Sequence, residues 1–578
     1  MTEKDLQKDL LHFLNQLNKV KSVSKANLML KDVCNVNYDF KTLDNLHNFC
    51  EFAKDYDNNI TLSSNGSKEW GDVQTPYEFV DKIYNLLKVW NVNPELIIEP
   101  TMGSGNFLLL GRKHYPNSSY FYGVEIQEGY IWEFLTKLLI SVLQNNNTKS
   151  NLIIDIHNDD IFSHEFPFDT NNFQEILIIG NPPWITIADL TKYQSKNIPS
   201  KNNTKDLSGL DALTGKSNFD ITETIIIKLL NHFKNFKGKI ALLCKDTVIR
   251  NIMKSQPKES YPITNIKAIK FDSKKIFQKV CNASLFVADI SKEKQDVMCS
   301  VSHFDDPKKV THRFGWINKK FVSNIDLYKK YQHLDDLFPL SWRQGVKHDC
   351  SKVLELTEDE NNIRNKQKQI VTVENDVIYP LLKGSDLRKY YVNTSTKKII
   401  LTQKKITENT SEIEHKYPKL WEYLVENKEH FQKRKSKIYK NDLFSMFGIG
   451  DYTFSSYKIA IAGLYKEPLF SLIPPIDNKP VILDDTCYFI GFETLEEAVV
   501  MTFILNSQVV YDFLNTIVFR ESKRPYTKEV LMRLNLKEIA TSIELKDFPE
   551  IEKRLNLPSQ FNLDFTKLCS SIRDIIEK

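Results

Sequence analysis

Apolar positions in the first 65 residues recur with the period of a helix. They fall every three or four residues over 6–17 and again over 43–52. This spacing places them on one face of a helix. The polar stretch 55–67 that follows is typical of a loop. We therefore predict an N-terminal helical extension over residues 1–68.

From residue 69 to residue 325 the pattern changes to short apolar runs that alternate with helical stretches. Two of the helical stretches are 130–143 and 221–233. Six runs have the length of buried strands: 96–98, 120–124, 152–154, 176–179, 240–243 and 285–288. This alternation predicts an α/β domain with a mostly parallel sheet. The polar segment 195–217, rich in lysine and asparagine, is expected to be a mobile loop.

Residues 326–578 lose this alternation and mix short strands, turns and helices, which predicts a second domain of α+β type. The whole chain has a net charge of only +4, but residues 381–440 hold 15 Lys and Arg against 7 Asp and Glu. Local positive charge of this kind suits a surface that binds phosphates. The candidate DNA contacts lie in three basic segments and are Lys383, Arg388, Lys433, Arg434, Lys435, Lys523 and Arg524.

Composition excludes several classes of protein. The chain has 8 cysteines, without a CxxC pair or a Cys/His cluster, so we expect reduced thiols and no metal site. No run of about 18 apolar residues indicates a membrane span. The N-terminus is charged and lacks the apolar core of a signal peptide. These features favour a cytoplasmic protein, and they leave open whether it is a monomer or a dimer.

Two glycines follow the first predicted strand and precede a helix. The segment runs from Glu99 through Thr101 to Gly103 and Gly105. Glycine at such a turn lets a ligand approach the backbone closely. A third glycine at the dinucleotide spacing is missing, which disfavours a nicotinamide cofactor.

Acidic residues follow the next two predicted strands. Glu125, about 20 residues after the glycine turn, suits hydrogen bonds to ribose hydroxyls. The third strand is followed by Asn158, Asp159, Asp160 and Ile161, where a carboxylate or an amide can accept from an adenine amino group and Ile161 can lie against the ring. Ligands bind at the carboxyl ends of parallel strands, so these residues are expected to meet at one nucleoside site.

The fourth predicted strand ends in Asn-Pro-Pro-Trp, residues 181–184. Prolines fix the backbone of this turn and remove two N–H donors. The Asn181 amide oxygen and the Pro182 carbonyl then provide two acceptors for the two hydrogens of one amino group. Trp184 offers a flat face on which a base can stack. The turn therefore indicates methyl transfer to an exocyclic amine of a base that has left the duplex stack.

The order of these motifs resembles the gamma-class amino-methyltransferases of DNA, the type represented by the Taq adenine methyltransferase. The resemblance covers residues 70–290 and implies a Rossmann-like catalytic domain, S-adenosyl-L-methionine as methyl donor and adenine N6 in double-stranded DNA as target. It also implies a C-terminal target-recognition domain and a restriction-modification system in which methylation protects host DNA. The segment 70–76 matches the leading cofactor motif, and the segment 274–284 matches a late motif whose Phe277 stacks on the second face of the flipped base.

The resemblance assigns the site residues one by one. The cofactor-binding set is Thr75, Glu99, Thr101, Gly103, Gly105, Glu125, Ile126, Asp160 and Ile161. The catalytic set is Asn181, Pro182, Trp184 and Phe277.

Three alternatives stay open. Trp184 stands where the family more often has tyrosine, and tryptophan also occurs in cytosine-N4 enzymes. RNA and protein glutamine methyltransferases also use an Asn-Pro-Pro-aromatic turn, although they are usually much shorter. The third alternative is a DNA-binding subunit whose methyltransferase fold is inactive.

Overall fold

The computed structural model describes residues 3–56, 73–145, 152–170, 172–186, 220–291, 293–359, 362–543, 549 and 552–553. The segment 195–217 and the start of the 70–76 motif lie outside the described residues. The described chain forms two compact units that divide between Phe321 and Val322, close to the boundary expected between 325 and 326.

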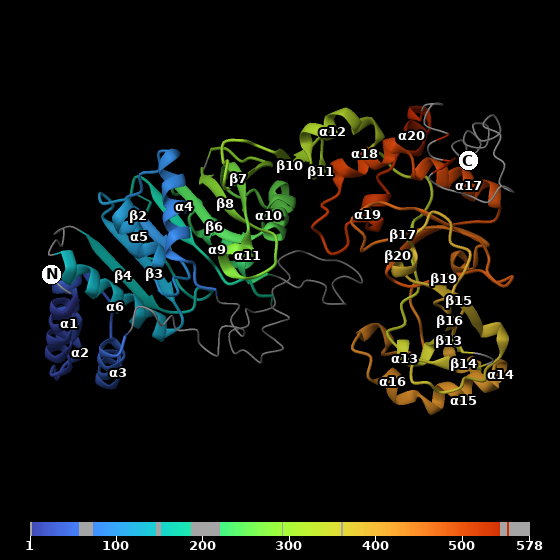
Figure 1. The fold of residues 1–578 in the computed structure, drawn as a ribbon, viewed down its shortest axis with the longest axis horizontal. Coiled ribbons are helices and arrows are strands. Elements are labelled where there is room, and N and C mark those ends of the chain that lie inside the picture. The colour runs from blue at the N-terminus through green and yellow to red at the C-terminus, as the bar shows by residue number, and fades with distance from the viewer. Residues whose placement is uncertain are drawn as a thin grey trace. The chain divides into compact units, whose positions relative to one another are not determined.

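The first unit is built on an 11-stranded sheet of order β1-β4-β3-β2-β5-β6-β8-β7-β9-β10-β11 (Figure 1). The strands are β1 Val36–Asn37, β2 Leu96–Glu99, β3 Tyr120–Glu125, β4 Ile153–Asn158, β5 Ile176–Gly180, β6 Gly238–Lys245, β7 Ile263–Phe271, β8 Ala283–Ile290, β9 Met298–His303, β10 His312–Ile317 and β11 Lys320–Val322. From β1 to β6 every neighbouring pair is parallel, whereas β8 runs antiparallel to both β6 and β7. The predicted mostly parallel, Rossmann-like sheet is confirmed.

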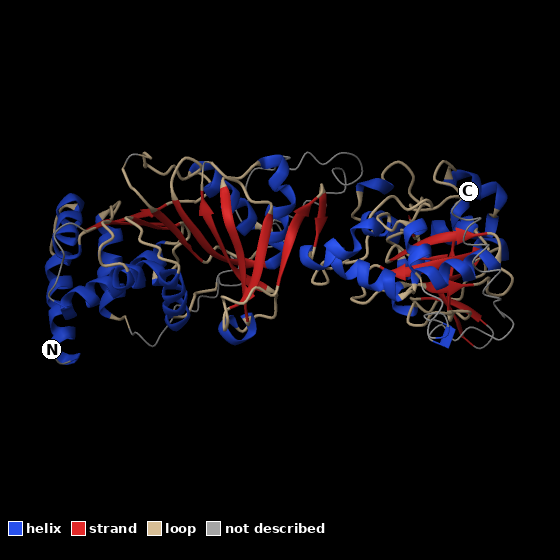
Figure 2. Cartoon of the chain, turned by 90° about the horizontal axis from the view of Figure 1, so that it is seen from above, coloured by secondary structure: helices blue, strands red, loops and turns tan. Residues whose placement is uncertain are grey.

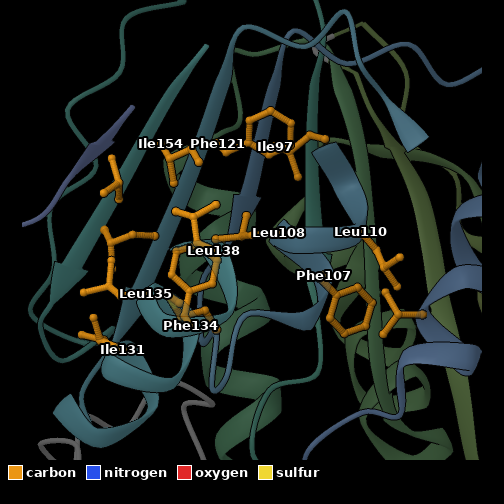
Figure 3. Close-up of a cluster of buried hydrophobic side chains, with 14 of the residues drawn as sticks. Ile97, Phe107, Leu108, Leu110, Phe121, Ile131, Phe134, Leu135, Leu138 and Ile154 are labelled. Atoms are coloured by element: carbon orange, nitrogen blue, oxygen red, sulfur yellow. The ribbon is translucent and has the colours of Figure 1, made fainter. Parts of the chain in front are cut away.

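Helices cover both faces of this sheet (Figure 2). They are α4 Tyr77–Val89, α5 Asn106–His114, α6 Glu128–Asn145, α9 Ile221–His232, α10 Asp246–Glu259 and α11 Ser273–Phe277. On one face, Leu108 of α5 and Leu138 of α6 pack with Ile97 and Phe121 of the strands (Figure 3). Ile98, whose side chain points to the opposite face, is also fully buried. Strands buried on both faces read as continuous apolar runs, which is why the sequence revealed them.

The N-terminal residues do not form a separate domain. Helices α1 Glu3–Asn18, α2 Val23–Cys34 and α3 Leu43–Lys54 contribute Leu14, Leu30 and Phe49 to the same core as the sheet. Strand β1 extends the sheet by pairing parallel to β4. The described part of the helical extension predicted over 1–68 therefore shares the core of the unit that carries the pocket.

The second unit contains two smaller sheets and a set of helices, as predicted for an α+β domain. Its sheets have the orders β12-β20-β17-β18 and β14-β13-β16-β15-β19. The strands are β12 Arg343–Gln344, β13 Glu355–Asp359, β14 Asn362–Asn365, β15 Ile378–Leu382, β16 Lys397–Ile400, β17 Tyr457–Ala462, β18 Ser471–Ile473, β19 Ile482–Leu483 and β20 Cys487–Phe492. The α-helices are α12 Ile325–Tyr331, α13 Ser351–Leu354, α14 Ile413–Lys416, α15 Pro418–Glu426, α16 Lys428–Gln432, α17 Leu495–Leu505, α18 Gln508–Ile517, α19 Lys528–Leu531 and α20 Leu536–Ser542.

Within the described residues, no helix has the length and apolar character needed to cross a membrane. The same residues contain no group of three or more His, Cys, Asp or Glu side chains arranged to hold a metal ion.

Candidate active site

A pocket opens at the carboxyl ends of β2, β3, β4 and β5. Chain order reverses between β2 and β5, and ligands of open α/β sheets bind at such a switch point. Eleven of the predicted site residues line this one pocket: Thr75, Glu99, Thr101, Gly103, Glu125, Ile126, Asp160, Ile161, Asn181, Pro182 and Trp184.

The glycine turn depends on two left-handed backbone positions, Gly103 with φ 51° and Gly105 with φ 71°. Gly103 faces the pocket, and its N–H donates to Glu125 Oε2 at 2.8 Å. Gly105 does not line the pocket. A Cβ there would lie 2.2 Å from Phe134 Cδ2, so this glycine lets the turn pack on α6. The cofactor contact expected for Gly105 stays a prediction, beside this packing role.

Glu125 is held at the tip of β3 by backbone donors on both sides. Its Oε1 accepts from the N–H of Gln127 at 2.8 Å, while Oε2 accepts from Gly103. The side chain is 7% exposed. The carboxylate lines the pocket, at the strand end where ribose hydroxyls are expected to bind.

Glu99 is a buried acid at the pocket floor. Its Oε2 accepts from the N–H of Leu108 at 3.1 Å. Burial raises the pKa of Glu99 well above its usual range, and the neighbouring Glu125 raises it further, while the Leu108 N–H opposes the shift. The neighbouring Glu99 and Glu125 thus place two carboxyl groups at this side of the pocket, and burial disfavours the charged form of Glu99.

The residues that follow β4 lie in the pocket, as expected for the third predicted strand, but both of its adjacent acids do so. Asp160 Oδ1 accepts from the N–H of Phe162 at 3.0 Å, which fixes this carboxylate beside Ile161. The neighbouring Asp159 also lines the pocket and is bonded to His164 Nδ1 at 2.8 Å. The sequence offered two adjacent acids and no means of telling which one faces the ligand, because each strand-end side chain depends on the turn that follows.

Other pocket residues were not among the predicted site residues, although several of them lie inside the quoted motifs. They are Val73, Gln74, Pro100, Met102, Asn106, Phe107, Val124, Gln127, Tyr130, Asp159, Phe162, Pro183, Ile185, Ile221 and Ile225. Gln74 adjoins Thr75 and accepts from the N–H of Ser104 at 3.1 Å, which joins the segment before α4 to the glycine turn. Its position next to Thr75 was the one available signal.

Asn181 has a fixed orientation. Its Nδ2 donates to the Val73 carbonyl at 2.9 Å. A carbonyl only accepts, so the amide nitrogen must face Val73 and the oxygen must face away from it. Asn181 Oδ1 is buried and has no hydrogen-bond partner in this structure. Buried acceptors are rarely left unpaired, so this oxygen marks the place of a donor from a bound ligand.

The carbonyls that follow in the Asn-Pro-Pro-Trp turn are engaged. Pro183 O accepts from Thr222 Oγ1 at 2.7 Å. Trp184 O accepts from Lys245 Nζ at 3.0 Å, and the same ammonium pairs with Asp220 at 2.7 Å. These bonds brace the turn from α9 and β6.

Trp184 and Phe277 are in direct contact, which sharpens the role expected for Phe277. Their ring centroids are 5.3 Å apart at an interplanar angle of 80°. A base stacked between two rings needs roughly 7 Å, twice the 3.5 Å contact distance of carbon atoms. Phe277 does not line the pocket, so it can stack on a base only if the two rings separate.

The basic residues expected to contact DNA divide into two groups. Lys383 pairs with the buried Glu355 at 2.6 Å, and Arg524 donates to the Asp485 carbonyl at 2.9 Å. Arg434 donates to the carbonyls of His348, Leu443 and Ser445 and stacks on Tyr439. These bonds give Arg434 a structural role, so our expectation of a DNA contact no longer holds for it. The side chains that remain exposed are Arg388, Lys433, Lys435 and Lys523.

Comparison with known proteins adds independent findings. The family profile described as N-6 DNA Methylase matches residues 56–310. A type II methyltransferase, M.NspV from a Nostoc species, is 36% identical over 478 residues, which is 82% of this chain and 98% of the relative. Among solved structures, the type IIL restriction-modification enzyme MmeI in complex with DNA is 12% identical with a TM-score of 0.47, over 99% of this chain and 88% of that chain. The type IIG restriction endonuclease BpuSI is 12% identical with a TM-score of 0.35, over 98% and 71%.

A pocket at the switch point of a Rossmann-like sheet is the arrangement found in S-adenosylmethionine-dependent methyltransferases. The extent of the sequence identity then makes the family plain. This chain belongs to the type II DNA methyltransferases that carry an N-6 DNA methylase domain. Its methyl donor is S-adenosylmethionine.

The pocket residues fit this donor. Glu125 presents a carboxylate for ribose hydroxyls, and Gly103 lets a ligand approach the turn. Thr101 Oγ1 is a second buried polar atom of the pocket without a partner, so the cofactor side also holds an unused hydrogen-bonding group.

Proposed function

We propose that this protein methylates N6 of adenine at specific sites in duplex DNA, after the adenine has flipped out of the base stack. The observation that carries the proposal is the buried, unpartnered Oδ1 of Asn181, whose direction is fixed by the Val73 carbonyl. An exocyclic amino group supplies the donor that this oxygen lacks.

Two acceptors position the amine. Asn181 Oδ1 and the Pro182 carbonyl bind its two hydrogens, which reduces delocalisation of the nitrogen lone pair into the ring and directs it towards the cofactor side. The buried face of Trp184 stacks on the base. This positioning, rather than a strong general base, lowers the barrier. Transfer breaks the bond between the sulfonium sulfur and the methyl carbon, forms the bond to nitrogen, and leaves that nitrogen cationic until it releases one proton to solvent.

The cofactor side is formed by Glu125, Gly103 and Thr101, with Asp160 and Ile161 at the adenine ring of the nucleoside. When bound, S-adenosylmethionine supplies a methyl group on a sulfonium. Glu99 lines the same side of the pocket, where its carboxyl accepts from the N–H of Leu108.

The second unit serves, in this proposal, as the target-recognition domain. Its exposed Arg388, Lys433, Lys435 and Lys523 contact phosphates, which set affinity and register, while other side chains read base edges. The enzyme acts in the cytoplasm as a monomer or dimer and protects host DNA from a cognate restriction enzyme.

The test is methylation of a duplex DNA library, followed by mass analysis of the nucleosides and sequencing of the modified sites. We expect N6-methyladenine in a single sequence context, and Asn181→Ala should bind cofactor and DNA normally while losing at least about a hundredfold in turnover. N4-methylcytosine as the product would establish the cytosine alternative. Methylation of RNA or protein only, or no affinity for S-adenosylmethionine with DNA present, would overturn the proposal.

A further inference from the structure

A single apolar side chain stands out on the loop between α11 and β8. Val280 is 85% exposed, more than any other large hydrophobic residue among those described. Isolated exposed hydrophobic residues are common and need no explanation by themselves. Here the neighbours are unusual, because Lys274, Lys275 and Lys279 on the same short segment are also exposed.

The loop is held in shape from inside. Ser273, which is 3% exposed, has its hydroxyl 2.8 Å from the Lys279 carbonyl and 2.5 Å from the Cys281 carbonyl. The Cys281 N–H donates back to the Ser273 hydroxyl at 3.3 Å. Gln278 turns the chain with a left-handed φ of 54°. The hydrogen bonds of Ser273 therefore hold the turn in the shape that exposes Val280.

The strand register places this loop at the same edge of the sheet as the pocket. Ala283, the first residue of β8, pairs with Lys245 at the end of β6 and with Phe271 at the end of β7. The ring of Phe277, three residues before Val280, contacts Trp184 at a centroid distance of 5.3 Å. A flipped base on Trp184 therefore lies next to the segment that presents Val280.

The side of the loop away from Trp184 is open. It borders a groove whose lining includes Lys274, Lys275 and Val280. Lys275 lies 3.8 Å from Asp272, and both of these side chains are largely exposed, so this ion pair contributes little. The groove lining as a whole holds four lysines and four acidic residues, namely Lys82, Lys270, Lys274, Lys275, Glu78, Asp246, Asp272 and Asp305. The phosphate contacts are therefore assigned to the exposed Lys274 and Lys275 and not to the groove as a whole.

We propose that Val280 enters the base stack beside the flipped nucleotide while Lys274 and Lys275 contact the flanking phosphates. This inference rests on the proposed function. Extruding a base costs a few kcal/mol of stacking and pairing, and an apolar wedge between base steps offsets part of that cost. The exposed valine gains burial only in the complex, where it stabilises the flipped state.

The experiment compares Val280→Ala with Val89→Ala. Val89 is also exposed, at 59%, but it ends α4 and precedes β2, at the opposite edge of the sheet. Both variants are assayed with S-adenosylmethionine on the duplex site found by library methylation, and on the same duplex with an abasic position opposite the target adenine. A third duplex carries 2-aminopurine at the target, whose fluorescence rises when it leaves the stack.

On the fully paired duplex we expect Val280→Ala to lose about tenfold in kcat/KM, which is the effect of about 1.4 kcal/mol. We also expect a smaller 2-aminopurine signal. On the abasic duplex, where less pairing is broken, the loss should shrink to about twofold or less, and Val89→Ala should match the wild type throughout. An equal loss on both duplexes, or no loss, overturns the wedge while wild-type methylation leaves the proposed function intact.

The salt dependence of DNA affinity tests the phosphate contacts separately. Replacing both Lys274 and Lys275 with glutamine should reduce the slope of log affinity against log salt concentration by about 0.9 per lost contact. An unchanged slope with weaker binding would contradict phosphate contacts at these lysines.

Discussion

Lys458 in β17 is a buried lysine, only 1% exposed, whose ammonium donates to the Ser455 carbonyl at 2.6 Å. Burial lowers its pKa from 10.5 to about 7. Between these pH values the unfolded chain binds a proton that the folded protein does not, so the free energy of unfolding rises with pH in this window. Below pH 7 the full cost of burying the ammonium is present.

We therefore expect Lys458→Met to be more stable than the wild type by roughly 1–3 kcal/mol at pH 7, with the difference shrinking towards pH 9. Denaturant unfolding at both pH values measures this, with the exposed Lys389→Met as control. A stability difference that does not change with pH would contradict the titration of Lys458.

At the same scale, the sequence identified residue types but not their surroundings. It identified Asn181 as an acceptor, yet the direction of its amide depends on the Val73 carbonyl, 108 residues away along the chain. It also grouped Arg434 with its basic neighbours, although three distant carbonyls bind its guanidinium. Such contacts are made by tertiary packing and leave no local pattern.

At the scale of elements, the sharpest prediction concerns a substitution in the glycine turn between β2 and α5. Gly105→Ala puts a Cβ against Phe134 and keeps a left-handed φ of 71°, which costs about 1–3 kcal/mol in strain. We expect at least tenfold weaker S-adenosylmethionine binding by calorimetry and a lower Tm. Gly129→Ala in the first turn of α6 is the matched control, because a Cβ at Gly129 meets nothing within 4 Å. If Gly105→Ala and Gly129→Ala have the same cofactor affinity and the same Tm, the glycine turn tolerates a side chain.

In the segment after α16, three consecutive basic residues have two different roles: DNA contact is proposed for two of them, and the third stabilises the unit. Lys433 and Lys435 are exposed, whereas Arg434 is bonded inside the unit. Replacing both lysines with glutamine should weaken DNA binding and lower the salt slope by about 0.9 for each lost contact, without changing Tm. Arg434→Gln should instead lower Tm, because it leaves buried carbonyls unpaired. Salt titrations and thermal melts test both, and a Tm loss in the lysine variant would refute the assignment.

Element prediction from sequence followed the strength of the local signal. Buried strands such as β2 and β5 were found because both of their faces are apolar. Strand β1 has two residues and no period. Strand β1 forms because Asn35 ends α2 with a left-handed φ of 54°. The Asn35 carbonyl then accepts from the N–H of Ile154 in β4 at 3.0 Å. Strand β7 mixes lysines with apolar residues and was missed for that reason.

For the molecule as a whole, the proposed function divides cofactor binding and target recognition between two units that each have their own core. Every residue that lines the candidate cofactor pocket belongs to the first unit, and the exposed basic residues Arg388, Lys433, Lys435 and Lys523 belong to the second. The N-terminal helices pack on α6, whose Tyr130 lines the pocket, so they support the cofactor site without contacting it.

This division predicts where each ligand slows hydrogen exchange. S-adenosylmethionine at about 100 times its Kd stabilises the state that binds it by about 2.7 kcal/mol, and the protection should be confined to peptides before residue 322, strongest at the glycine turn and at β3. Duplex DNA containing the target should add protection around 383–389, 433–437 and 523–524, and around 274–282. Duplex DNA without the target should protect the basic segments more weakly, because phosphate contacts do not depend on sequence. Protection of the second unit by the cofactor alone would show that the two units are energetically coupled and would refute a division into independent cofactor and DNA-recognition units.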